Sequence, residues 1–136
     1  MFKLKKIMNS CVNVPEPEIV SAQPSLVLSA GSTAYSNTGT LTKGDATTKP
    51  THVLINAKEK GQEQALCYRI TPDMIFEVEA VGDNVGDICI GDYVCLYLEG
   101  AEGYSKCSDV FEGGVAYVYD NNGATKSGDT LYVSFE

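Results

Sequence analysis

Hydrophobic and polar residues alternate along several short segments of this 136-residue chain. In residues 74–80, Glu77 and Glu79 separate apolar neighbours, and Ile75 is the exception to strict alternation. A period of two is the pattern of a strand with one packed face and one face in water. Residues 130–135 alternate in the same way, so both segments are predicted to be strands.

Further strands are expected where β-branched and aromatic residues cluster between turn-forming residues. Charged or proline-containing turns separate them, such as residues 58–61 and 71–73. No segment keeps apolar residues at helical spacing for ten residues, and only residues 56–65 have room for a helical turn. The strands predicted in this way span residues 26–28, 51–56, 64–70, 88–90, 93–98 and 114–119, with an edge strand near residues 38–42 inside a loop that covers residues 29–49.

Gly–Asp pairs mark the turns in the second half of the chain. Glycine adopts the positive φ that tight turns need, and aspartate accepts hydrogen bonds from nearby backbone amides. Short strands joined by such turns predict an all-β fold, either a small antiparallel β-barrel or a sandwich. The pairs are Gly82-Asp83, Gly86-Asp87, Gly91-Asp92 and Gly128-Asp129.

The N-terminal segment differs from the rest in composition. Pro15, Pro17 and Pro24 lack a backbone donor and have a restricted φ, which favours an extended segment poorly suited to a central strand. We therefore predict an extended N-terminal arm, residues 1–25, and a single β domain, residues 26–136. An arm ordered against a partner and a disordered leader both fit this composition.

The charge balance argues against nucleic-acid binding. Eighteen acidic and ten basic residues give a formal charge of −8, which repels phosphate. The basic cluster of Lys3, Lys5 and Lys6 is too short to reverse this.

No apolar run is long enough to span a membrane. Only residues 7–8 are apolar after Lys6, too few for a secretory signal, so lipidation of Cys11 is not expected. A surface lipoprotein, the alternative, would lose its first ten residues.

Five cysteines are an odd number, and none form a C-x-x-C pair, which argues against a zinc site and a complete disulfide framework. Cys67, Cys89 and Cys95 lie in apolar runs, where cysteine behaves as a small buried hydrophobe. We expect reduced thiols and synthesis in a reducing cytoplasm, with one disulfide as the alternative.

Candidate chemistry is sparse. His52 is the only histidine and has no partner at motif spacing, so a structural hydrogen bond at a strand edge is expected. Residues 83–87 and 120–122 offer oxygen ligands, but neither follows the order of a calcium loop, and turn formation accounts for both. No catalytic, cofactor-binding or metal-binding residue is therefore assigned, and an enzyme is the least supported class.

Charged side chains on neighbouring predicted strands suggest one ion pair. Glu77 and Glu79 share a strand face beside the strand that carries Arg69. At an exposed position such a pair contributes less than about 1 kcal/mol.

Tyrosines form a second pattern. Tyr93 and Tyr97 share one side of a predicted strand, and Tyr117 and Tyr119 share one side of another. Tyrosine joins a large apolar ring to a polar tip, which suits protein interfaces. Packing within one sheet explains the same pattern, so both interpretations remain open.

Two segments carry a family resemblance. Residues 49–55 read KPTHVLI, and residues 67–78 read CYRITPDMIFEV. With the turn-rich stretch from residue 82 to 135, they resemble tailed-bacteriophage capsid decoration proteins, also called head cement or auxiliary head proteins. The likeness covers roughly residues 45–136 and rests on structural motifs rather than catalytic ones.

The resemblance implies a non-enzymatic virion protein, made in the host cytoplasm and bound to the outer surface of the head. Its partner would be the major capsid protein, whose neighbouring subunits it would stabilise, and possibly further copies of itself. The alternative is another virion component, such as a head-fibre base or tail protein that uses the β module to oligomerise. Partner contact is predicted for Lys3, Lys5, Lys6, Pro15, Pro17 and Pro24 of the arm.

Overall fold

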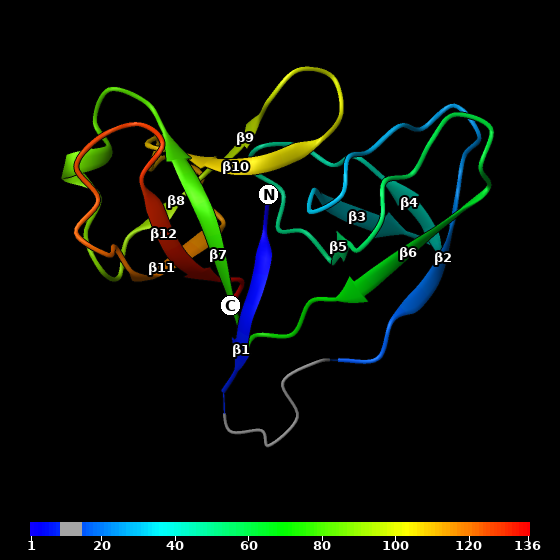
Figure 1. Ribbon diagram of the computed structural model, residues 1–136, viewed down its shortest axis with the longest axis horizontal. Coiled ribbons are helices and arrows are strands. Elements are labelled where there is room, and N and C mark those ends of the chain that lie inside the picture. Colours follow the sequence, from blue (N-terminus) through cyan, green and yellow to red (C-terminus); the bar gives the residue numbers. More distant parts are fainter. Residues whose placement is uncertain (9–14) are drawn as a thin grey trace.

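The computed structural model describes residues 1–8 and 15–136, and the regular secondary structure of these residues is almost entirely β-strand (Figure 1). The predicted all-β class is confirmed. In chain order the elements are β1 (Lys3–Ile7), β2 (Glu18–Ala22), β3 (Thr33–Asn37), β4 (Thr40–Thr42), β5 (His52–Leu54), β6 (Gln64–Arg69), β7 (Met74–Val81), the 3-10 turn η1 (Val85–Asp87), β8 (Tyr93–Val94), β9 (Leu96–Leu98), β10 (Tyr104–Ser108), β11 (Ala116–Asp120) and β12 (Thr130–Ser134).

Five strands close into a barrel in the order β2-β6-β5-β3-β4. Closure depends on β4, which pairs in parallel with β2 and antiparallel with β3. The edge strand expected near residues 38–42 is therefore wrong in one respect, because β4 has a neighbour on both sides. Small and medium-sized side chains fill this narrow interior, among them Val20, Ala34, Leu41, Leu54 and Cys67.

The remaining strands form a second sheet, ordered β10-β7-β12-β11-β8. Strands β1 and β10 follow one another along one edge of β7, while β12 pairs with the other edge. Strand β10 also meets β3 at Tyr104 and Thr33, which joins this sheet to the barrel. In Figure 1, β1 runs beside β7, between the two groups of strands.

The segment predicted as an arm contributes two of these strands, which corrects the expectation that it lies outside the core. Phe2 is 3% exposed, and its ring centroid lies 6.3 Å from that of Phe76 and 5.8 Å from that of Phe135. Strand β2 lies between β4 and β6. Pro17 and Pro24 flank β2 without interrupting it, so their missing donors do not break the ladder. Residues 9–14 lie outside the described part.

Local predictions succeed where alternation is strong. Strands are confirmed within residues 51–56, 64–70, 74–80, 114–119 and 130–135, and the run at 93–98 forms β8 and β9 with Cys95 between them. No strand forms at residues 26–28 or 88–90, and the helical turn lies at Val85–Asp87 rather than within residues 56–65. Strands β1, β2, β3 and β10 have no predicted counterpart.

Candidate functional site

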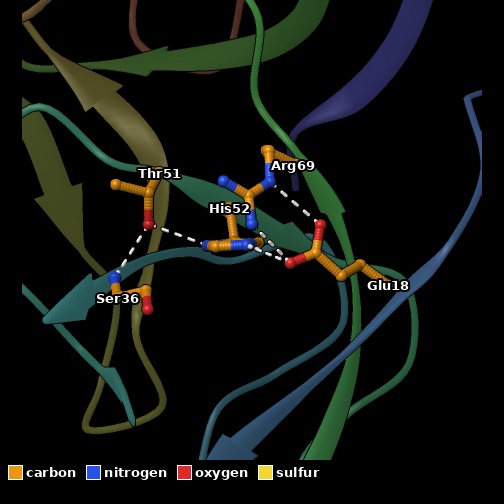
Figure 2. A network of polar contacts seen from close by, with 5 residues as sticks. All are labelled: Glu18, Ser36, Thr51, His52 and Arg69. Carbon is orange, nitrogen blue, oxygen red and sulfur yellow. Dashed lines mark hydrogen bonds and ion pairs between the residues drawn. The ribbon is translucent and has the colours of Figure 1, made fainter. Parts of the chain in front are cut away.

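A polar network around His52 contains residues of four neighbouring barrel strands (Figure 2). Its Nδ1 lies 2.8 Å from Thr51 Oγ1, and that hydroxyl oxygen accepts a 2.8 Å hydrogen bond from the backbone N–H of Ser36. On the other side of the ring, Nε2 lies 3.6 Å from Oε1 of Glu18. Arg69 donates to both carboxylate oxygens of Glu18, over 3.0 Å from Nε and 2.7 Å from Nη2.

Burial sets the protonation of this network. It lowers the pKa of His52, while the nearby Glu18 carboxylate acts in the opposite direction. The hydrogen bonds from Arg69 lower the pKa of Glu18. A neutral His52 with its proton on Nε2 directs that N–H toward Glu18 and accepts from the Thr51 hydroxyl. The hydrogen bonds of the network therefore tie β2 to β6 through Arg69, and β3 to the start of β5 through Thr51. The hydrogen bond between His52 and Thr51 agrees with the structural role predicted for His52.

Two of the four Gly–Asp turns use their carboxylates as acceptors for backbone N–H groups. Asp92 accepts a 2.7 Å hydrogen bond from the N–H of Cys89, and Asp129 accepts from the N–H groups of Thr125 and Lys126 at 3.0 and 3.2 Å. These two backbone hydrogen bonds lower the pKa of Asp129. Within residues 1–8 and 15–136, no three His, Cys, Asp or Glu side chains gather in a way that could hold a metal ion.

The four described cysteines are free thiols. Cys67, Cys95 and Cys107 are buried, and burial raises the pKa of all three, to about 12 for Cys67. Such thiols stay protonated and are poor nucleophiles. Cys89 is exposed, so its predicted burial is wrong. Cys11 lies outside the described residues.

The predicted partner-binding residues occupy two places in the fold. Lys3, Lys5 and Lys6 are exposed on β1, whereas Pro15, Pro17 and Pro24 flank β2 on the barrel. The structure therefore does not bring the lysines and the prolines together on one arm.

The predicted pairing of Arg69 with Glu77 or Glu79 is wrong. Arg69 binds Glu18, because β2 and not β7 lies beside β6. Glu77 instead lies 3.9 Å from Lys5 Nζ, and Glu79 lies 3.1 Å from Lys106 Nζ.

Tyrosines and lysines share the outer face of the second sheet, and we call this surface the tyrosine–lysine face. The rings of Tyr93 and Tyr117, on β8 and β11, have centroids 5.3 Å apart. Lys6 Nζ lies 5.3 Å from the ring centroid of Tyr119. Tyr97 lies on β9, which pairs with β10, whereas Tyr93 lies on β8, which pairs with β11, so the two tyrosines do not share one strand. The face is made of Tyr93, Tyr117, Tyr119, Tyr132, Lys3, Lys5 and Lys6.

Two shallow pockets follow one another along β7 on this face. The first, about 240 Å³, has Ile75 as its buried floor and Lys5, Lys6, Tyr119, Asp120 and Tyr132 around it. The second, about 270 Å³, lies against Lys3, Glu77, Glu79 and Thr130. The first pocket combines two ammonium groups, two phenol hydroxyls, the Asp120 carboxylate and an apolar floor. The two lysines outnumber the one carboxylate, so the set is suited to recognising a carboxylate with an apolar neighbour.

The sequence pattern alone does not connect Tyr132 and Ile75 with the lysines. The alternation in residues 130–135 does indicate that Tyr132 faces outward, opposite Leu131 and Val133. Its neighbours depend on β1 and β12 pairing with opposite edges of β7, and no local pattern reveals that pairing.

A larger open depression, about 640 Å³, lies on the barrel beside Ser21 and residues 61–64. Its lining is polar, with Glu63 as its charged side chain. It offers neither aromatic rings nor a cluster of like charge, so the tyrosine–lysine face is the stronger candidate for partner binding.

Comparisons with known proteins show a likeness of fold to a phage protein. No helix in the described part of the chain is both long and apolar enough to cross a membrane. No protein-family model matches the sequence, and the search of curated proteins found no match. Among solved structures, the chain is similar to the head fiber gp8.5 N base of bacteriophage phi29, at 17% sequence identity and a TM-score of 0.52. That likeness covers 89% of this chain and 93% of the phage protein, so the two share a fold over nearly their whole lengths.

Proposed function

We propose that this protein is a non-enzymatic structural component of a phage virion, attached to the outer surface of the head. The observation that carries the proposal is the fold shared with a phage head fiber base over nearly the full length of both chains. The sequence resemblance of residues 49–55 and 67–78 to capsid decoration proteins supports the same location independently.

The first specific role is decoration: the protein binds major capsid subunits and stabilises the contacts between them. A charge of −8 disfavours the DNA-filled interior of a head, where phosphate would repel the chain. Weak contacts repeated at many sites of a lattice add up to strong retention through multivalency.

The second role is the base of a head fibre, and the fold shared with the phage head fiber base supports it. A closed barrel joined to a second sheet is a stable platform from which a longer assembly can project. In this role the chain would assemble with further copies of itself as well as with the head.

The state of the reactive side chains supports a binding role. His52 is 2% exposed, and burial raises the pKa of the Cys67, Cys95 and Cys107 thiols. Free thiols also support synthesis in a reducing host cytoplasm.

Adding the purified protein to heads assembled without it tests the location. Gold-labelled antibody, viewed by negative stain, should mark the outside of the heads, and the protein should sediment with the major capsid protein. Labelling confined to tails, or no sedimentation with heads, would overturn the proposal.

Copy number and head stability separate the two roles. A decoration protein should occupy a regular lattice and raise the temperature at which heads release DNA. A fibre base should be present at fewer sites and leave that temperature unchanged.

A further inference from the structure

We propose that the pocket between β1 and β12 on the tyrosine–lysine face is the contact with the head, and that it receives an acidic side chain from an extended, partly apolar segment of a major capsid subunit. This inference rests on the proposed function and specifies the surface and the chemistry of the partner.

The lysines lie on a fixed strand. Strand β1 pairs with β7 from Lys3 opposite Glu77 to Ile7 opposite Met74. Phe2, directly before the strand, is packed in the core of the second sheet. A partner therefore meets ammonium groups already held in position, and binding costs less conformational entropy than ordering a free arm would.

Charge complementarity selects an acidic partner. Three of the ten basic residues of the chain lie within this one strand, although the whole protein carries a charge of −8. Lys5 Nζ is 3.9 Å from Glu77 and its side chain is 56% exposed, so it can reach a second carboxylate. An acidic segment is repelled by most of this protein and attracted at β1, which favours one docking orientation.

The apolar part of the pocket selects the neighbours of that acidic side chain. Ile75 is 2% exposed and forms the floor, and the rings of Tyr119 and Tyr132 stand beside it. Lys6 Nζ lies 5.3 Å from the Tyr119 ring centroid, which keeps the ammonium group at the pocket. Desolvated tyrosines are frequent energetic centres of protein interfaces.

The second pocket favours an extended partner segment. It continues along β7 from the first pocket but has no aromatic ring in its lining, which consists of Met1, Lys3, Glu77, Val78, Glu79 and Thr130. A segment laid along β7 would therefore place its acidic and apolar residues near Ile75 and its polar residues beyond Glu77.

Binding to heads tests the inference with charge-matched variants. Lys5→Glu with Lys6→Glu should weaken binding to heads assembled without the protein by at least tenfold at low salt, and the difference from wild type should shrink as salt rises. Lys49→Glu with Lys60→Glu changes the net charge equally on exposed barrel positions and should bind within twofold of wild type. Tyr119→Ser keeps the charge and should also weaken binding at least fivefold.

The unfolding midpoint of each variant is compared with that of the wild type, so that poor folding is not mistaken for weak binding. If the double reversal on β1 lowers the midpoint, Lys6→Gln and Tyr119→Ser carry the comparison instead. If the wild type binds heads and the β1 and barrel variants bind them equally well, this inference is overturned and the proposed function is left intact. Failure of the wild type to bind heads would overturn both.

Zero-length carbodiimide cross-linking of assembled particles gives an independent result. A bond between Lys5 or Lys6 and an aspartate or glutamate of the major capsid protein supports the inference. Cross-links from these lysines only to another copy of this chain, or to no partner protein, would overturn it.

Discussion

The ammonium group of Lys58 donates a 2.7 Å hydrogen bond to the backbone carbonyl of Gln23, from a side chain that is 1% exposed. A second hydrogen bond, of 3.3 Å, reaches the carbonyl of Pro24. The backbone groups of Lys58 and Leu28 also exchange two hydrogen bonds. One lysine thus fastens the segment after β2 to the turn after β5.

Replacing Lys58 with methionine should destabilise the protein by about 1–3 kcal/mol, because the buried stem is retained while the two carbonyls lose their donor. The midpoint of urea unfolding measures the change. Lys60→Met, at an exposed position two residues away, is the matched control and should stay within about 0.5 kcal/mol of wild type. Equal midpoints for the two variants would contradict a structural role for the ammonium group.

Lys58 shows what local sequence patterns miss. Residues 58–61 are charged and predict an exposed turn, yet the lysine is buried because a distant segment supplies its acceptors. Strands β3 and β10 are missed for a different reason: each pairs with its neighbour in the chain, β4 or β9, but their sequences, TAYSN and YSKCS, contain few large apolar residues. Alternation predicts β7 and β12 because each buries one face and exposes the other.

The candidate site likewise combines features that the local sequence shows with contacts that depend on strand pairing. The basic cluster and the outward tyrosines can be found in the sequence, but the contact of Lys6 with Tyr119 requires β1 to lie in the sheet. Prolines and a short apolar pattern favoured an arm instead. The sequence pattern does not show that Phe2 is buried. Burying its ring stabilises β1, a strand that is otherwise rich in lysine.

Phe2→Ala should therefore cost about 3 kcal/mol of unfolding free energy, since it leaves a cavity beside Phe76 and Phe135. Denaturant unfolding followed by tyrosine fluorescence measures the loss. Ile19→Ala is the control on β2, the other strand within the segment predicted as an arm. Ile19 is 67% exposed, so this substitution should change the unfolding free energy little. A free arm would give two variants of equal stability.

His52 should make the protein less stable in mild acid. Burial lowers its pKa in the folded state below the ordinary value of 6.5, so the unfolded chain binds a proton more readily. Stability is then complete above pH 6.5 and falls as the pH drops below it, by no more than about 1.4 kcal/mol per pH unit for one proton. The pKa of Glu18 is also lowered, and its contribution is lost only below its ordinary value of 4.5.

Unfolding free energies measured from pH 8 to pH 3.5 check this sign. His52→Gln should remove the slope between pH 6.5 and pH 5 while keeping any loss below pH 4.5. A slope unchanged by the substitution would assign the titration to another group.

Gly82 and Asp109 offer a test of the Gly–Asp turns. Gly82 has φ of +135°, and a Cβ there would overlap the Asp109 carboxylate, whose Oδ2 accepts a 2.6 Å hydrogen bond from the N–H of Asn84. Gly82→Ala should cost roughly 3 kcal/mol, from backbone strain and the displaced acceptor together. Gly39→Ala, with φ of +86° and nothing within 4 Å, should show the strain alone, about 1 kcal/mol.

A double-mutant cycle separates the overlap from the strain. Combined with Asp109→Ala, the Gly82→Ala substitution should cost about as little as Gly39→Ala, because the overlapping carboxylate is gone. Thermal unfolding of the four cycle members measures the coupling. Strict additivity would mean that Asp109 moves aside freely and that φ alone demands glycine at this turn.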